Sequence, residues 1–184
     1  MRTIADHLFD ILENSINAHA SKIRVTISFF KNIFLCRIID NGIATSLENI
    51  TDPFVTSKKT RRVGLGLPLL KSTVEETGGN LKLSRLEKSS GTCLEFTINM
   101  AHIDARPFGD IPAVFVDSLR SWPEIDFEIF ICNTKKEKNI LDTIELKSML
   151  ELDILQDMEI LNFIKGQLRK ELLKIGINQQ FGVS

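Results

Sequence analysis

Apolar residues recur with helical spacing at the start of the chain and with strand spacing directly afterwards. Between residues 4 and 18 they fall at positions 4, 8, 11, 12 and 16, which predicts an amphipathic helix with one apolar stripe. From residue 23 to residue 29 every second side chain is apolar, and residues 33–39 form a nearly continuous apolar run. Because Lys31 and Asn32 separate these two runs, the pattern predicts a β-hairpin.

The pattern changes after the hairpin. Residues 41–63 are rich in Gly, Pro, Ser, Thr and basic side chains and have no sustained period, which predicts a long loop. Loops of that length in compact domains are usually functional. A helix is then predicted over residues 67–77, closed by the Gly-Gly pair that follows it. Further alternation predicts two strands around residues 81–83 and 94–98.

The last part of the chain, residues 101–184, has a different order of predicted helices and strands from that of the first hundred residues. Asp110 is predicted to cap a helix that ends near Ser121, and residues 125–132 are predicted to form a strand. The remainder is predicted to be helical and acidic, with one apolar stripe along residues 157–175. No catalytic motif is found in this part, so we expect an α/β extension, mostly helical, that contacts a partner or a second copy, or that only covers exposed sheet.

Composition excludes several classes of protein. The chain has 23 basic and 24 acidic side chains among 184 residues, so it has no global field with which to hold nucleic acid or an anionic membrane. No apolar stretch approaches the roughly 20 residues that cross a bilayer, and we expect a cytoplasmic protein. Three cysteines without CxxC spacing predict buried free thiols in place of a disulfide framework or a zinc site.

The first predicted helix carries an unusual polar face. Asp10, Asn14 and Asn17 lie on one side of it, although Asp and Asn are weak helix formers. Mg²⁺ prefers carboxylate and amide oxygens together with water and phosphates. Asn14 could supply such a ligand, and Asp10 could accept a proton from an attacking water or hydroxyl. From this helix alone, a merely solvated polar face is the alternative.

A second candidate is the sequence Asp40-Asn41-Gly42, which directly follows an apolar strand. Asn-Gly is a favoured turn dipeptide, so an ordinary tight turn is one interpretation. The functional interpretation is that Asp40 accepts a hydrogen bond from an exocyclic amine such as that of adenine. Gly42 would then let the ring approach the backbone closely.

A third candidate is the junction from Lys58 to Leu67, where four cations precede a Gly-x-Gly and a predicted helix. Glycines before a helix N-terminus expose backbone N–H groups that can bind phosphate. The spacing is neither that of a Walker loop nor the GxGxxG of dinucleotide-binding folds. By itself, this junction could equally be a solvated basic loop.

The order of these segments resembles that of one superfamily. Residues 12–23 resemble the Asn-containing box of MutL-like and gyrase-like ATPases, and residues 38–43 resemble their Asp-Gly box. Residues 52–58, 63–71 and 90–96 look like the Phe box, the second glycine box and the final Gly-Thr box of sensor histidine kinases. The chain is therefore similar, over residues 1–100, to the ATPase domain shared by gyrase, heat-shock chaperones, histidine kinases and MutL.

This resemblance implies a fold and a site. The fold is a two-layer α/β sandwich with a mixed sheet, the Bergerat-type ATP-binding fold. Residues 1–100 would form this ATP-binding domain and residues 101–184 the extension. Asn14 would coordinate Mg²⁺, Asp40 would recognise the adenine amine, and Thr92 would support Asp40 through a water. The implied nucleotide-binding residues are Asn14, Asn17, Asp40, Gly42, Phe54, Lys58, Gly64, Leu65, Gly66, Leu67 and Thr92.

Asp10 stands four residues before the Mg²⁺ ligand, where hydrolysing members of the superfamily carry Glu, so the resemblance implies general-base chemistry there. Two departures, Ala44 and Arg62 in place of glycines, put fast turnover in doubt more than ATP binding. The phosphoacceptor helical hairpin of a sensor kinase and the transducer domain of MutL and gyrase are expected to be lacking.

We therefore expect a protein that binds ATP and Mg²⁺ and either hydrolyses ATP slowly or transfers phosphate to a separate protein. The alternatives are a non-catalytic ATP-dependent switch and a scaffold that has lost ATP.

Overall fold

A computed structural model describes residues 3–43, 66–86, 90–133, 136–149 and 155–178. Within these residues one sheet holds six strands, in the order β3-β4-β2-β1-β5-β6. The strands are β1 (Lys22–Phe30), β2 (Ile33–Asp40), β3 (Leu81–Arg85), β4 (Thr92–Asn99), β5 (Asp126–Asn133) and β6 (Lys136–Asp142). The helices are α1 (Ile4–Asn17), α2 (Gly66–Glu76), α3 (Ile111–Ser121), α4 (Thr143–Met149) and α5 (Met158–Lys174).

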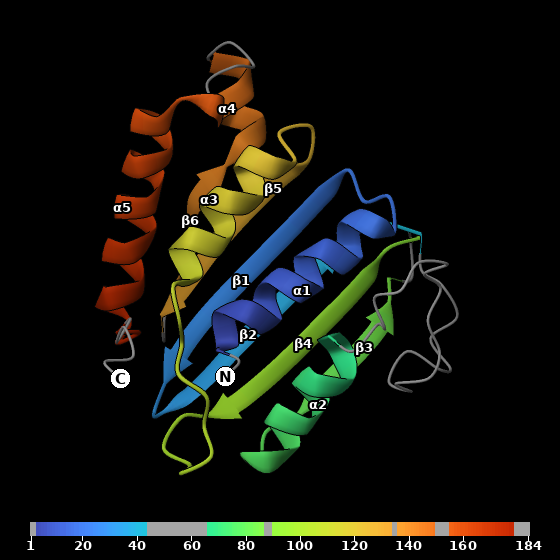
Figure 1. Cartoon of the computed structure of the whole chain (residues 1–184), viewed down its shortest axis with the longest axis vertical. Coiled ribbons are helices and arrows are strands. Elements are labelled where there is room, and N and C mark those ends of the chain that lie inside the picture. Colours follow the sequence, from blue (N-terminus) through green and yellow to red (C-terminus); the bar gives the residue numbers. More distant parts are fainter. Residues whose placement is uncertain (1–2, 44–65, 87–89, 134–135, 150–154, 179–184) are drawn as a thin grey trace.

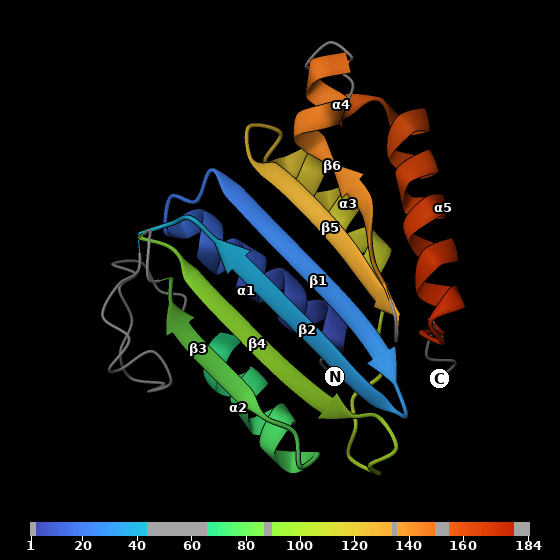
Figure 2. The same cartoon turned by 180° about the vertical axis from the view of Figure 1, so that it is seen from behind.

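The architecture is a two-layer α/β sandwich, as the sequence predicted. The β1–β5 pair is parallel and the other strand pairs are antiparallel, so the sheet is mixed. Helices α1, α2 and α3 cover one face of the sheet (Figure 1), and α5 packs against α3 and β6. Seen from behind, none of the described helices lies in front of the sheet (Figure 2).

The hairpin between β1 and β2 has the predicted turn. Lys31 and Asn32 both have positive φ angles, of 48° and 64°, which is the backbone that a two-residue type I′ turn requires. Phe30 therefore pairs with Ile33, and the register continues to the pair Ile23–Asp40. This register brings Asp40 to the end of the sheet near the C-terminal end of α1.

The start of α1 is fixed by the segment that precedes α3. Thr3 caps α1 with a capping box, in which its hydroxyl accepts from the Asp6 N–H. The N–H groups of Ile4 and Ala5 donate to the carbonyl oxygens of Pro107 and Phe108, both at 2.9 Å. The first-turn donors of α1, which have no partner inside a helix, are thus satisfied by a segment remote in sequence.

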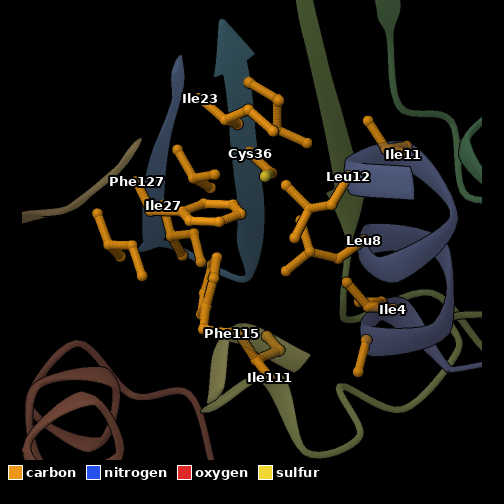
Figure 3. Packing of buried hydrophobic residues seen from close by; sticks show 14 of the residues in the cluster. Ile4, Leu8, Ile11, Leu12, Ile23, Ile27, Cys36, Ile111, Phe115 and Phe127 are labelled. Carbon is orange, nitrogen blue, oxygen red and sulfur yellow. The ribbon is translucent and has the colours of Figure 1, made fainter. Parts of the chain in front are cut away.

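The core lies between the helices and the sheet. Apolar side chains of α1 point toward those of β1, β2 and β5, with residues of α3 packed beside them (Figure 3). The predicted stripe of α1 is buried at four of its five positions, and Ile16 is partly buried. The labelled members of this cluster are Ile4, Leu8, Ile11, Leu12, Ile23, Ile27, Cys36, Ile111, Phe115 and Phe127.

One element differs from the sequence prediction. Residues after 132 were expected to be helical, but Lys136–Asp142 forms β6, an edge strand antiparallel to β5. Its first four residues are exposed and mostly charged, so they give no strand signal in sequence, and charge is common on edge strands. The helices α3 and α5 lie where the sequence predicted them, and Asp110 caps α3 by accepting from the Ala113 N–H at 3.0 Å.

The second part of the chain extends the sheet formed by the first. Strand β5 pairs with β1 along seven residue pairs from Lys22–Asp126 to Ser28–Cys132. Parallel strands need a crossover, and α3 provides the helix of that connection. Among the helices that the structure describes, none is both long enough and apolar enough to cross a membrane.

Candidate functional site

Asp40 is the centre of the candidate site. It is the last residue of β2 and is only 6 % exposed. Its Oδ2 accepts hydrogen bonds from the hydroxyls of Ser15, at 3.0 Å, and Thr92, at 2.6 Å. Its Oδ1 accepts from the backbone N–H of Gly42, at 2.9 Å. The bond from Thr92 is direct, whereas the resemblance implied an intervening water.

These contacts leave room for one more donor. An ionised carboxylate offers about four acceptor positions and no donor. Three donors from described residues reach Asp40. Among these donors, Oδ1 thus accepts one hydrogen bond and Oδ2 accepts two.

The backbone around Asp40 is held against the end of α1. A Cβ on Gly42 would lie 2.8 Å from the carbonyl oxygen of Ala18 and 3.0 Å from the Ala18 Cβ, so this close approach requires glycine. The next N–H, of Ile43, donates to the same Ala18 oxygen at 2.7 Å. Asn41 Oδ1 accepts from the N–H groups of Ser21 and Lys22, both at 2.9 Å. The Asp-Asn-Gly sequence thus forms a fixed corner.

Asp10 lies farther along α1, where that helix meets α2. A Cβ built on Gly66, the first residue of α2, would be 3.0 Å from the Asp10 Cβ and 3.3 Å from its Oδ2. The Asp10 side chain is half-buried. The structure therefore places the predicted general base beside the residue predicted to meet the phosphates.

Asn14 and Asn17 follow on the same helix and both are exposed. Asn14 lies one turn beyond Asp10, so the two side chains project from neighbouring positions. Among the described residues there is no cluster of three or more His, Cys, Asp or Glu that could hold a metal ion.

Other predicted residues have different positions. Phe54, Lys58, Gly64 and Leu65 lie outside the described residues. Leu67 is 8 % exposed and belongs to the hydrophobic core, so its backbone N–H in the first turn of α2 is the group it could offer a ligand. The described residues brought together are thus Asp40, Gly42 and Thr92 at one position, and Asp10 and Gly66 at another, with α1 joining them.

Ser15 is a site residue that sequence reasoning missed. It is 5 % exposed and bonds to Asp40 across 25 residues of sequence. Its position could have signalled this role, because it follows Ile11 by four residues and Leu12 by three and therefore lies on the apolar stripe of α1. A hydroxyl on a buried stripe needs a buried partner.

The cysteines differ in their burial. All three are free, with Cys36 buried and the other two half-buried. Burial raises the pKa of Cys36 far above its ordinary value and also raises the pKa of Cys93, the neighbour of Thr92. Both therefore remain protonated thiols at neutral pH. The prediction of free thiols is confirmed for all three cysteines, whereas the prediction of burial is confirmed for Cys36 alone.

Comparison with protein families agrees with this arrangement. Residues 2–102 match the family described as histidine kinase-, DNA gyrase B-, and HSP90-like ATPase. The chain belongs to this ATPase family. The matched residues include the end of β2, the whole of α1 and the start of α2, which together carry the candidate site.

Solved structures similar to this ATPase-family chain include catalytic parts of histidine kinases. The catalytic domain of histidine kinase ThkA in a nucleotide-free form is 24 % identical, with a TM-score of 0.41 over 51 % of this chain and 64 % of that one. A mycobacterial sensor histidine kinase, MprB, is 19 % identical, with a TM-score of 0.39 over 50 % of this chain and 68 % of that one.

Full-length ShkA in complex with AMPPNP is 20 % identical, with a TM-score of 0.39 over 50 % of this chain and 21 % of that one. The chain thus spans less than two thirds of the length of the ThkA domain. No curated protein matches the sequence.

Proposed function

We propose that this chain binds ATP with Mg²⁺ at the site built on α1 and the end of β2. Asp40 is the observation that supports this proposal most strongly. It is a buried acid that is held by neutral donors alone among the described residues, and it keeps an acceptor position on Oδ1. The 6-amino group of adenine is a donor that fits this position, whereas guanine presents a carbonyl there.

The other residues of the site have complementary roles in this proposal. Asn14 would offer its amide oxygen to Mg²⁺, and the start of α2 at Gly66 would face the phosphates. Phosphoryl transfer needs positioning and charge neutralisation more than covalent chemistry by the protein. Bound Mg-ATP would supply the transferable phosphoryl group.

Asp10 would act as general base. Its carboxylate would take the proton from a water, which gives slow hydrolysis, or from a hydroxyl of a separate protein, which gives phosphotransfer. The contact between Asp10 and Gly66 supports this assignment, because it places a carboxylate beside the proposed phosphate end of the site. The partner protein would be recognised outside this site, and the extension that carries α3–α5 is the surface we assign to that contact.

Single-turnover assays with ATP labelled in its terminal phosphate test the proposal. The wild-type protein should bind Mg-ATP and release labelled phosphate slowly. Asp10→Asn should retain binding and lose turnover by about 100-fold or more, the usual contribution of a general base. The matched control is Asp117→Asn, which neutralises an exposed acid on α3 and should turn over at the wild-type rate.

The same assays separate the competing functions. Binding without turnover in the wild-type protein would indicate a nucleotide switch, and equal rates for wild type and Asp10→Asn would remove Asp10 from the catalytic role. Absence of a thermal shift with Mg-ATP would show that the chain does not bind ATP.

A further inference from the structure

The interface between α1 and α2 contains a buried polar contact that the nucleotide site does not use. His7 of α1 is 1 % exposed and Thr73 of α2 is 5 % exposed. His7 Nε2 and Thr73 Oγ1 are 3.2 Å apart, across 66 residues of sequence. Either group can be the donor, because the role of Nε2 depends on the tautomer. The structure thus gives His7 a specific partner.

The position of this contact links it to the proposed site. His7, Asp10 and Asn14 follow one another at intervals of three and four residues, so they lie along one stripe of α1. Two contacts on this stripe reach α2, one from Asp10 to Gly66 at the start of α2 and one from His7 to Thr73 in its third turn. Gly66 and Thr73 thus both lie on the side of α2 that faces this stripe.

Besides an exposed ion pair between Glu76 and Arg106, α2 is held among the described residues by apolar side chains, whose contacts are less directional. Leu67, Leu70 and Val74 bury it in the hydrophobic core. Apolar packing is non-directional, and its free energy depends mainly on the area removed from water. A hydrogen bond between two buried groups needs one distance and one direction, and any shift that breaks it leaves polar atoms without water. The His7–Thr73 bond therefore selects one arrangement among several that the apolar residues would accept.

We propose that His7 is a positioning residue which, through Thr73, holds the start of α2 against Asp10. The proposal rests on the proposed function, because it assigns to this contact the alignment of the general base with the phosphate end of the site. His7 touches no reacting atom in this account. Its effect would be transmitted along α2, which begins beside Asp10 at Gly66 and carries Thr73 in its third turn.

Amide hydrogen exchange of the protein without nucleotide tests whether the His7–Thr73 hydrogen bond stabilises α2. Thr73→Val keeps the shape of the side chain and removes the hydroxyl, so protection of the α2 amides should fall by about 5-fold, the effect of one net hydrogen bond. Thr73→Ser restores a hydroxyl and should keep wild-type protection, and α5 should exchange alike in all three proteins. Equal protection of α2 in the valine and serine variants would overturn the proposal.

Calorimetry with Mg-ATP and Mg-ADP tests whether this hydrogen bond affects nucleotide binding. The preference for Mg-ATP over Mg-ADP should fall by about 5-fold in Thr73→Val and in His7→Leu, because the terminal phosphate is the one that this proposal places between Asp10 and the start of α2. His7→Gln, whose amide group can take the place of Nε2, should retain more of that preference than His7→Leu. If either apolar variant fails to fold, Thr73→Ala takes its place in both measurements.

The possible failures are distinguishable. A wild-type protein that binds neither nucleotide would contradict the proposed function. A wild-type protein that binds both, with variants that lose affinity for both in parallel, would show that the contact is merely structural and would overturn this inference alone.

Discussion

Two carboxylates of the central sheet, Asp40 on β2 and Glu128 on β5, are almost equally buried, at 6 % and 7 % exposed, but are held in different ways. Asp40 accepts from two hydroxyls and one backbone N–H. Glu128 is paired with two cations, at 2.8 Å from Arg24 Nε and 3.2 Å from Lys22 Nζ. The first acid lies beneath α1, and the second lies among the side chains of the face without helices.

This difference is consistent with the ligand-binding role that we propose for Asp40 and with a structural role for Glu128. Two cations satisfy Glu128 in charge and in hydrogen bonds, so a further donor would have to displace one of them. Neutral donors orient Asp40 without cancelling its charge, and its Oδ1 keeps an acceptor position. Equal burial therefore does not imply equal function, and the type of partner is the informative observation.

The largest effect that should follow from this comparison is on nucleotide binding. Asp40→Asn replaces a charged acceptor with a neutral amide and should weaken Mg-ATP binding by about 10- to 100-fold, as expected for a hydrogen bond to a charged group. Isothermal titration measures it. Glu128→Gln is the matched control, because it removes the same charge from an equally buried position of the same sheet, and it should bind Mg-ATP within about 2-fold of wild type.

Glu128, in contrast, should contribute to the stability of the fold. Glu128→Gln should lower the free energy of unfolding by about 1 kcal/mol, the upper end of the range for pairs with exposed cations, because Lys22 and Arg24 are themselves 40 % and 46 % exposed. Urea unfolding measures the change. An unchanged midpoint would mean that the pairing of β1 with β5 does not depend on this ion pair.

Removing one of the hydroxyl donors to Asp40 should have a smaller effect on nucleotide affinity than changing Asp40 itself. Ser15→Ala removes one of the two hydroxyls at Oδ2 and should weaken Mg-ATP binding by about 3- to 10-fold, in line with a net hydrogen-bond contribution of about 1 kcal/mol. Thr92→Val, which removes the other hydroxyl, gives the comparison within the same titration series. Wild-type affinity in both variants would show that the orientation of Asp40 does not depend on them.

The smallest effect should appear in the pH dependence of stability. The hydrogen bond from Arg24, followed by that from Lys22, lowers the pKa of Glu128 below its ordinary value. Because the folded-state pKa is the lower one, the stabilisation is present above the unfolded-state pKa of about 4.3 and is lost as the pH falls through the folded-state pKa. The stability difference between wild type and Glu128→Gln should therefore be constant near neutral pH and shrink in acid. Urea unfolding at several pH values measures it, and a constant difference into acid would contradict it.

Sequence patterns predicted the elements that are determined by residues close together in the chain. The periodicity of residues 4–16, the Lys31-Asn32 turn and the Asp110 cap each depend on neighbours in sequence, and the structure confirms all three. The strand β6 was missed because its pairing with β5 determines it, and its own exposed residues are charged.

In the candidate site, too, contacts between residues far apart in sequence could not be predicted. Asp10, Asn14 and Asp40 could be found because they stand in recognisable motifs. The apolar stripe of α1 signals that Ser15 needs a buried partner, but neither the partner of Ser15 nor that of Thr73 could be identified, because the two contacts join residues 25 and 66 positions apart. Sequence thus identifies the groups that would meet a ligand more readily than the groups that hold them.

The most direct test of the account is calorimetric titration of the wild-type protein with Mg-ATP and with Mg-GTP. If the retained acceptor position on Asp40 selects the purine, Mg-ATP should bind at least about 10-fold more tightly, because guanine would set a carbonyl against a carboxylate. Equal affinity for the two nucleotides, or tighter binding of Mg-GTP, would contradict the role assigned to Asp40.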